Sequence, residues 1–513
     1  MKTYRTLLLA MFICWIPSSA LAQADLSSLD EYFESSRSDW DVPGMAVAIV
    51  KDGEIVHIGG YGVLEVGSST KVDEHTLFAI ASNTKAFISS SIASLVDAGK
   101  MSWDDPIRKH LPYFQLVDEV ATQRATVRDA LSHGVGLGTY SGDVIWYKSN
   151  HTAEEVLKLV SHLEPAFEFR TGYGYSNVMF VAAGEVIGAV AGKPWDEYVQ
   201  DHFFDPLGMS RSQTSTARLK ELGNVATPHK ISAGANLAIG FADWYSMGSG
   251  ASASVISSAH DMAQWVRMHL NEGELNGTRY YSEAAQQQMW HPQFNYSVTP
   301  STRETYPGRN FNGYGLAFGV SEYRGQFMAA HGGAYDGMYS RVAMVPDMEL
   351  GIVVLTNTMK NMGPWLVYDI VDAYLGDSVR DWSGYGLERD NRSKTAFANR
   401  MDSFRDARVE GTSPTLERDN IEGTYHDDLY GGIVVATEEG TLRLTFPRSP
   451  DLNATLEHFH YDTYEIKWDQ THSWFDFGTV QFESNHKREV VGMSFSVPNE
   501  DIFFEEINPK KVN

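Results

Sequence analysis

Alternating apolar and polar positions predict strands near both ends of the first 375 residues. Residues 45–61 (MAVAIVKDGEIVHIGGY) alternate around Asp52 and Gly53, which predicts a β-hairpin with a tight turn. Strand patterns return after residue 312, in the runs 313–323, 326–333, 338–345 and 350–357. An antiparallel sheet assembled from these two distant parts of the chain is therefore expected.

Helical spacing dominates the stretch between these strands. Residues 82–98 carry apolar side chains at helical intervals, and Gly99 follows at the expected stop. Further helical segments, broken by Gly- and Pro-bearing loops, fill residues 100–310, and a last one covers residues 362–375. Strands at both ends with helices between them predict an α/β (α+β) sandwich of one antiparallel sheet covered by helices.

The pattern changes after Gly376. Residues 377–412 are charged and poor in apolar side chains, which predicts a linker with some helix. From about residue 419 come eight short strand-like runs separated by turn signals, the last of them DIFFEEI at residues 501–507. Eight short strands in about a hundred residues predict a small up-and-down β-barrel. The expected division is therefore a first domain over residues 23–376, a linker over 377–412 and a barrel over 413–513.

The first 22 residues have the pattern of a signal peptide. Lys2 and Arg5 precede an apolar run at residues 7–16, and Ala20-Leu21-Ala22 forms a small-residue cleavage site. We therefore expect export to the periplasm or the medium, a mature chain beginning at Gln23, and no stable membrane insertion after cleavage. The single cysteine, Cys14, lies inside this segment, so the mature chain has no thiol for a disulfide, a nucleophile or a metal.

Composition excludes some classes of partner. The chain has 66 acidic and 41 basic residues and a net charge of −25, which disfavours binding to nucleic acid or to anionic membrane surfaces. Neither H-E-x-x-H nor G-x-S-x-G occurs, which argues against a zinc peptidase and against an α/β-hydrolase. We expect no metal and no cofactor.

The first candidate motif is Ser82-Asn83-Thr84-Lys85, at the start of the predicted helix 82–98. One helical turn places the Lys85 amine on the same face as the Ser82 hydroxyl, where a neutral amine can take its proton. By itself the motif is equally compatible with an N-cap serine and a surface lysine. The same spacing recurs at Ser68 and Lys71, in a polar stretch without helical periodicity that predicts a solvated loop.

Two further motifs follow in order along the chain. In Tyr175-Ser176-Asn177 the phenol can relay protons and the amide can orient a lysine or a substrate, although the glycines around it also suit a simple turn. In His331-Gly332-Gly333, at the end of a predicted strand, glycines allow close approach to the backbone and the imidazole can donate a hydrogen bond into a cleft.

Together, S-x-x-K opening a helix, then Y-x-N, then H-x-G on a strand resembles the penicillin-binding and class C β-lactamase-like serine hydrolases, in their D-aminopeptidase and esterase branch. The segments FAIASNTKAF, MSWDDPIRKHLP, LSHGVGL and FFDPLGM are similar to the same family, over roughly residues 26–375. The last hundred residues resemble the lipocalin-like barrel appended to many members, through IEGTYHDDLYGGIVV and DIFFEEI.

The resemblance implies a role for each matching residue. Ser82 would be the acylated nucleophile, Lys85 and Tyr175 would share the acid and base work, and Asn177 would position them. The backbone N–H groups of Ser82 and Ala334 would form the oxyanion hole, with His331, Gly332, Gly333 and Ala334 along the substrate.

One departure from the family pattern affects the expected substrate. β-Lactamases and carboxypeptidases of this family usually carry lysine and then threonine or serine where this chain has His331 and Gly332. A histidine near half-charge replaces a permanent cation. Together with the predicted signal peptide, the resemblance therefore implies an exported hydrolase of small peptides, amides or esters, including D-amino-acid-containing or linearised cyclic peptides. A β-lactamase, a D-alanyl-D-alanine carboxypeptidase and a penicillin-binding receptor without turnover are the alternatives, and a homo-oligomer through the barrel stays open.

Overall fold

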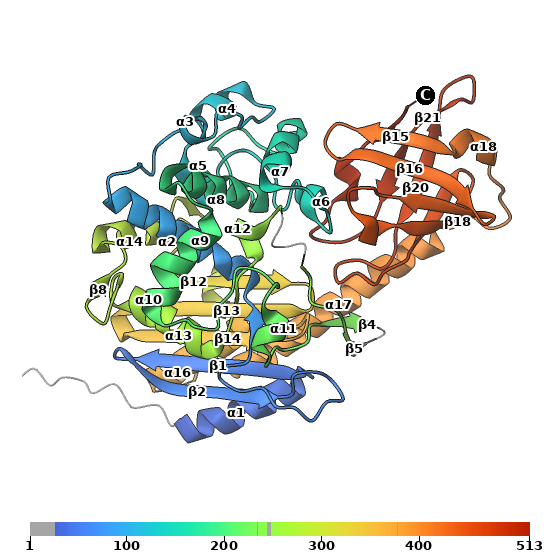
Figure 1. Ribbon diagram of the computed structural model, residues 1–513. Helices are drawn as coiled ribbons and strands as arrows, with labels where there is room; N and C mark the ends of the chain where they lie inside the picture. The colour runs from blue at the N-terminus through green and yellow to red at the C-terminus, as the bar shows by residue number, and fades with distance from the viewer. Residues whose placement is uncertain (1–25, 233, 244–247, 377, 513) are drawn as a thin grey trace, which may run out of the picture.

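The computed structural model describes residues 26–232, 234–243, 248–376 and 378–512, so the signal peptide predicted for residues 1–22 lies outside the described part. The described chain forms a sheet-and-helix domain and a closed barrel, which one long helix connects (Figure 1). This arrangement confirms the antiparallel sheet covered by helices and the separate all-β barrel that the strand and helix patterns predicted.

An eight-stranded antiparallel sheet forms the centre of the first domain. The N-terminal hairpin pairs with the later strands through β1 and β14, in the register Met45 opposite Thr356. This pairing of segments about 300 residues apart confirms the expected assembly of the sheet from both ends. The strands, in their order across the sheet, are β2 (Glu54–Gly62), β1 (Gly44–Lys51), β14 (Leu350–Thr356), β13 (Met338–Val345), β12 (Gln326–Tyr335), β11 (Gly319–Tyr323), β10 (Asn312–Tyr314) and β9 (Phe294–Asn295).

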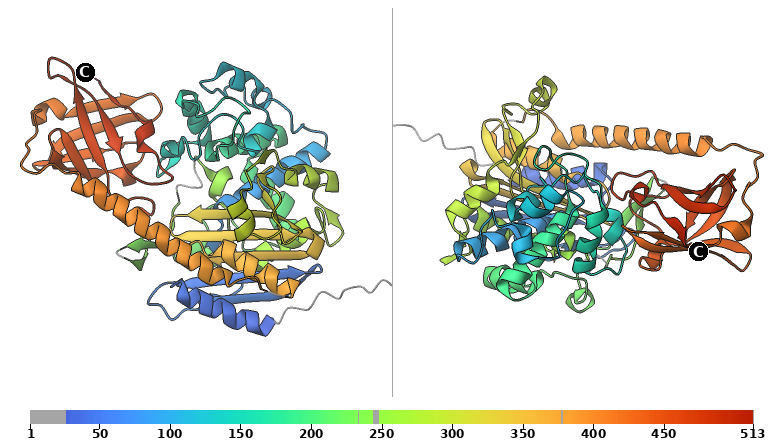
Figure 2. Two further views of the ribbon diagram at one scale, coloured as in Figure 1. Left: turned by 180° about the vertical axis from the view of Figure 1, so that it is seen from behind. Right: turned by 90° about the horizontal axis from the view of Figure 1, so that it is seen from above.

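Helices cover both faces of this sheet (Figures 1 and 2). On one face lie α1 (Leu26–Asp39) and α16 (Gly363–Leu375), which pack their apolar sides against the sheet around Phe33 and Ile370. On the other face α13 (Ala259–Leu270) lies against β1 and β14, and α2 (Thr84–Asp97) and α8 (Asn177–Ala191) form the centre of a larger helical layer. Burial of apolar stripes from both layers against one sheet supplies most of the folding energy of such a domain.

Short helices complete the first domain, which also contains three small two-stranded sheets. The helices are α3 (Ile107–His110), α4 (Glu119–Arg124), α5 (Val127–Leu131), α6 (Asp143–Trp146), α7 (Ala153–Leu159), α9 (Trp195–Val199), α10 (Asp205–Leu207), α11 (Leu219–Leu222), α12 (Gly250–Ala253), α14 (Glu283–Trp290) and α15 (Pro300–Thr305), and the strand pairs are β3 (Phe78–Ala79) with β6 (Ile256–Ser257), β4 (His229–Ser232) with β5 (Ala235–Ala238), and β7 (Glu274–Leu275) with β8 (Thr278–Arg279).

No single described helix has both the length and the apolar character needed to cross a membrane. Helix α8 meets that test only together with the helical segment Trp195–Leu207, and the two are bent by 74° at their junction.

The C-terminal domain is a closed barrel of eight strands, each paired with its neighbour in sequence and the last with the first. Seven strands lie where the alternating runs predicted them. DIFFEEI was wrongly predicted as a strand: it contains the 3₁₀ turn Phe504–Glu506, and the eighth strand is Lys510–Val512. The strands are β15 (Gly423–Asp427), β16 (Gly431–Glu438), β17 (Thr441–Thr445), β18 (Ala454–His460), β19 (Thr463–Trp468), β20 (Thr479–Ser484), β21 (Val490–Ser496) and β22 (Lys510–Val512).

Helix α17 (Trp382–Asp406) connects the two domains over 25 residues (Figure 2). Its first turn is fixed to the first domain, because the Asp369 carboxylate accepts the backbone N–H groups of Trp382 and Ser383, both at 3.0 Å. Most of its later side chains are exposed, in agreement with the polar composition of the predicted linker. A helical connection of this length separates the barrel from the sheet along a stiff element.

The barrel also contacts the first domain directly, through the loop that joins β19 and β20. The Lys230 ammonium lies 2.8 Å from the Asp476 carboxylate, and the indole N–H of Trp474 donates to the Asp336 carboxylate at 2.7 Å. These contacts hold the barrel against strand β4 and against the turn between β12 and β13 of the first domain.

Limited proteolysis tests this two-domain organisation. The exposed, non-helical stretch at residues 408–415 should be cut first, because a protease needs an extended and accessible backbone. A glutamyl endopeptidase should therefore cleave after Glu410 and release a folded fragment of roughly a hundred residues, visible by mass spectrometry. First cleavage inside either domain, with this stretch intact, would contradict the division.

Candidate active site

Ser82 lies on a strained turn at the entrance to α2. It occupies the 3₁₀ turn Ala81–Asn83, and Ala81 adopts a left-handed backbone with φ of 48°. A left-handed alanine costs on the order of 1–2 kcal/mol, so other contacts must hold the turn. Ser340 on β13 provides two of them: its hydroxyl donates to the Ile80 carbonyl at 2.6 Å and accepts from the Asn83 amide at 2.8 Å.

Strand β12 passes very close to this turn at Gly333. A Cβ added there would lie 2.1 Å from the Ile80 carbonyl oxygen and 2.9 Å from the Ser82 nitrogen, so only glycine fits. From the sequence we expect these glycines to leave space for substrate. At Gly333 the turn Ala81–Asn83 occupies that space. The close approach brings the strand that carries Ala334 against the backbone N–H of Ser82.

Lys85 is completely buried beneath Ser82. Its Nζ lies 3.0 Å from Ser82 Oγ, 2.7 Å from Asn177 Oδ1 and 2.9 Å from the Ser252 carbonyl oxygen. Burial lowers the pKa of Lys85 from its usual value to about 7, against the opposing effect of the Asp143 carboxyl. A large fraction of this amine is therefore neutral at physiological pH and able to accept a proton.

Asn177 is oriented by a residue that the sequence did not single out. Its Nδ2 donates to the buried Asp143 carboxyl at 2.7 Å, which turns the amide oxygen toward Lys85. Asp143 also accepts from the Trp146 indole at 2.9 Å, and burial raises the pKa of Asp143 well above its usual range. The backbone N–H of Gly142, the residue before α6, donates to Glu506 of the barrel at 2.8 Å. The barrel thus supports the helix that carries Asp143.

Tyr175 also lies next to Lys85, whose Nζ is 4.9 Å from the centre of the phenol ring. Burial raises the pKa of Tyr175 well above 10, and a hydrogen bond with Ser82 opposes that rise. The His133 ring lies 4.4 Å from the Tyr175 ring, and its Nδ1 accepts the backbone N–H of Ser176 at 2.9 Å. The phenol is therefore neutral and lies next to both Lys85 and His133.

His331 is buried and both of its ring nitrogens have partners within the protein. Nε2 lies 3.0 Å from the Tyr314 hydroxyl, and Nδ1 lies 2.5 Å from the Gly332 carbonyl. Burial, together with the positive charge of Lys85, lowers the pKa of His331 to about 3. The expectation of a half-charged imidazole was wrong, because burial penalises the charged form. The neutral ring braces Gly332 instead of pointing a free donor into the cleft.

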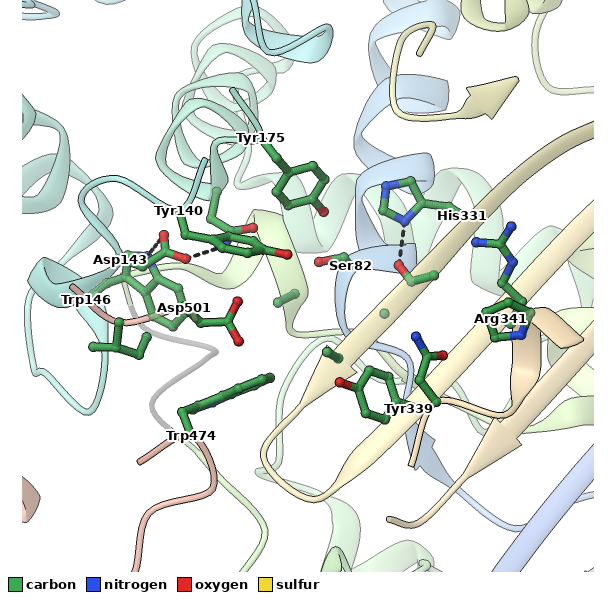
Figure 3. Close-up of a pocket in the computed structure, with 18 residues that line it drawn as sticks. Ser82, Tyr140, Asp143, Trp146, Tyr175, His331, Tyr339, Arg341, Trp474 and Asp501 are labelled. Carbon is green, nitrogen blue, oxygen red and sulfur yellow. Dashed lines mark hydrogen bonds between the residues drawn. The ribbon is translucent and has the colours of Figure 1, made fainter. Parts of the chain in front are cut away.

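These residues surround one pocket, with a volume of about 230 Å³ (Figure 3). Among the residues predicted from the sequence, the lining contains Ser82, Tyr175, Asn177, His331, Gly332, Gly333 and Ala334, with Lys85 directly beneath. The S-x-x-K at Ser68 lies elsewhere: Lys71 is exposed, and Ser68 accepts the backbone N–H of Thr70. Among the described residues, no group of three His, Cys, Asp or Glu side chains could hold a metal ion.

The barrel forms part of the pocket wall, through Trp474, Asp501 and Ile502. Sequence patterns did not identify these residues, because their approach to Ser82 depends on how the two domains meet.

Arg341, which also lines the pocket, was missed although a signal existed in the sequence. The two-residue turn Asp336-Gly337 pairs Tyr335 with Met338, and this register places Arg341 opposite Gly332.

Comparison with known proteins gives matches over most of the chain. The family model described as Beta-lactamase matches residues 29–374, and a model described as a domain of unknown function (DUF3471) matches residues 407–511. The chain is 28% identical over 482 residues to "Unguisins hydrolase ungD" of Aspergillus violaceofuscus, across 85% of this chain and 83% of that protein.

Two solved structures share the fold. An octameric penicillin-binding protein homologue from Pyrococcus abyssi superposes with a TM-score of 0.62 at 19% identity, over 95% of this chain and all of that one. A D-amino acid amidase from Ochrobactrum anthropi superposes with a TM-score of 0.54 at 21% identity, over 68% of this chain and 97% of that one.

Substitution of Asp143 tests the orientation of Asn177. Asp143→Ala should leave a buried amide N–H without its acceptor and free the amide to rotate away from Lys85. We expect a loss of stability of about 1–3 kcal/mol in urea unfolding, and a fall in kcat for ester hydrolysis of about tenfold or more. Asp143→Asn keeps one acceptor oxygen and should retain more of both. Wild-type stability and kcat in Asp143→Ala would show that the amide needs no such support.

Proposed function

Because the chain belongs to the Beta-lactamase family of hydrolases, we propose that it is an exported serine hydrolase that cleaves amide or ester bonds through an acyl-enzyme on Ser82. The observation that carries this proposal is the set of three contacts made by Lys85. Two of its partners, the Asn177 amide oxygen and the Ser252 carbonyl oxygen, can only accept hydrogen bonds. The third, the Ser82 hydroxyl, can also donate.

A neutral lysine amine satisfies these three partners completely. Its two N–H groups donate to the two carbonyl-type oxygens, and its lone pair then faces the Ser82 hydroxyl. In this arrangement Ser82 donates its proton toward Lys85, which makes the amine the general base for attack. Ser82 Oγ bonds to the substrate carbonyl carbon, and its proton moves to Nζ of Lys85.

Tyr175 is suited to the opposite task. Its raised pKa keeps the phenol protonated at neutral pH, so it supplies a proton rather than removing one. The leaving amine or alcohol takes this proton as its bond to the carbonyl carbon breaks, and Lys85 then returns its proton to the phenol. The backbone N–H groups of Ser82 and Ala334 stabilise the oxyanion. Water then attacks the acyl-enzyme by the same groups in reverse.

We assign peptides and amides as the principal substrates, including those that contain D-amino acids or come from linearised cyclic peptides. The name of the unguisins hydrolase and the fold shared with a D-amino acid amidase support this choice. His331 is neutral and held by Tyr314 and Gly332, unlike the lysine at this position in the usual third motif of β-lactamases. A β-lactamase, a D-alanyl-D-alanine carboxypeptidase or a receptor without turnover is the alternative.

The eight-stranded barrel is also the surface through which we propose assembly into homo-oligomers.

One set of assays tests the proposal. Wild-type protein should hydrolyse aminoacyl nitroanilides or short-chain nitrophenyl esters, and should turn over a chromogenic cephalosporin more slowly by orders of magnitude. Ser82→Ala should abolish turnover and labelling by a fluorophosphonate. Lys85→Ala and Tyr175→Phe should each lower kcat by about 10² or more, as expected for groups that move protons in the transition state.

The matched control is Ser68→Ala, in the S-x-x-K that ends at Lys71. It should behave as wild type, and loss of activity there would overturn the assignment of the nucleophile. Faster turnover of the cephalosporin than of any ester or amide would favour the β-lactamase alternative, and a burst without steady turnover would favour the receptor.

A further inference from the structure

The pocket around Ser82 has charges of opposite sign on its two sides. In the view of Figure 3 the Asp501 carboxylate lies on one side of Ser82 and the Arg341 guanidinium on the other. The two residues come from different domains, Asp501 from the barrel and Arg341 from β13 of the sheet. Neither takes part in the proton transfers assigned to Lys85 and Tyr175.

Asp501 is presented on a rigid loop. Asn499 fixes that loop: its Nδ2 donates to the carbonyl oxygens of Val497 and Ile502, both at 2.7 Å, and its Oδ1 accepts the backbone N–H of Asp501 at 2.9 Å. A loop held in place before binding loses little entropy when its side chains contact a ligand. The backbone that carries the Asp501 carboxylate is thus preorganised at the wall of the pocket.

The surroundings of Asp501 favour a cation. Burial, then the neighbouring carboxylates of Glu500 and Asp336, raise the pKa of Asp501 to about 7. In the described parts of the chain, no lysine or arginine lies within ion-pair distance of this carboxylate. A positively charged group of a ligand would offset the repulsion between these acids and stabilise the ionised form.

Arg341 has the complementary property. Gly332 carries no side chain, so the guanidinium approaches the strand edge and one of its terminal nitrogens lies 3.6 Å from the position a Cβ would take. Its Nε is buried with no hydrogen-bond partner in the described structure. A buried guanidinium N–H without an acceptor is costly, and a carboxylate is its best-matched partner.

We propose that the pocket selects short peptides with both ends free, binding the ammonium at Asp501 and the carboxylate at Arg341 on either side of the scissile bond. The pocket volume of about 230 Å³ is below the 300–1,000 Å³ typical of small-molecule sites. The smallest molecule that carries both charges and one cleavable amide is a free dipeptide. The barrel then recognises one of the two charged ends of the substrate, through Asp501. This inference rests on the proposed hydrolase function.

The test uses one dipeptide, alanyl-alanine, in four forms: free, N-acetylated, C-amidated and blocked at both ends. Each form is assayed as the L,L and the D,D isomer with the full-length protein. Blocking either end should lower kcat/KM of the wild type by about ten- to a hundredfold, the range for one charge-assisted hydrogen bond. Blocking both should lower it further.

Two variants test the recognition of the two ends of the dipeptide separately. Asp501→Asn should remove the penalty for N-acetylation and keep the penalty for C-amidation, and Arg341→Met should do the reverse. Asp428→Asn, at an exposed carboxylate of the same barrel, should keep both penalties. As a control, hydrolysis of neutral nitrophenyl acetate by each variant shows whether the protein is folded and whether Ser82 still reacts.

Equal kcat/KM for the four forms would overturn the inference, as would an N-acetylation penalty that survives in Asp501→Asn. Ester hydrolysis by wild type without cleavage of any dipeptide form would also overturn it, while leaving the serine hydrolase proposal intact. If the wild type neither hydrolyses the ester nor labels at Ser82, the proposed function itself fails, and the inference fails with it.

Discussion

The burial of the Lys85 amine is the interaction on which the rest of the site depends. An ammonium removed from water loses several kcal/mol of solvation, and a nearby carboxylate partner would have restored its charge. Here the contacts are an amide oxygen, a backbone carbonyl and a hydroxyl, none of them charged. The environment therefore favours the neutral amine over the cation, and the pKa falls to about 7. A surface lysine at the same sequence spacing would remain protonated and could not act as a base.

Several features that cost folding stability support the contact between Lys85 and Ser82. Ala81 takes a left-handed backbone so that Ser82 faces Lys85, and Ser340 holds the strained turn. Gly333 lets β12 run against the turn, and Asp143 is buried to keep the Asn177 amide in one orientation. Strain and buried polar groups of this kind persist only where the surrounding structure supports them. Their concentration around one serine distinguishes it from the other serines that precede a lysine by three residues.

Local patterns in the sequence predicted the sheet, the barrel and the three motifs, because each depends on spacing within one element. Ser82 and Lys85 lie one helical turn apart, and Tyr175 and Asn177 lie two residues apart at the start of a helix. Asp143 and Asp501 could not be found in this way, since their positions depend on contacts between distant segments. The charge of His331 was mispredicted for a related reason: burial sets it, and burial is a property of the folded chain.

The pH dependence of Ser82 acylation tests the central claim most directly. The folded-state pKa of Lys85 is lowered to about 7, so the amine gains its base function as the pH rises through that value. The rate constant for inactivation by a neutral fluorophosphonate should rise with an apparent pKa near 7 and level off about one to two units above it. Lys85→Ala should be slow and lack this step. A rate that rises only near the ordinary lysine pKa of about 10.4, or a step at 7 that persists in Lys85→Ala, would contradict the account.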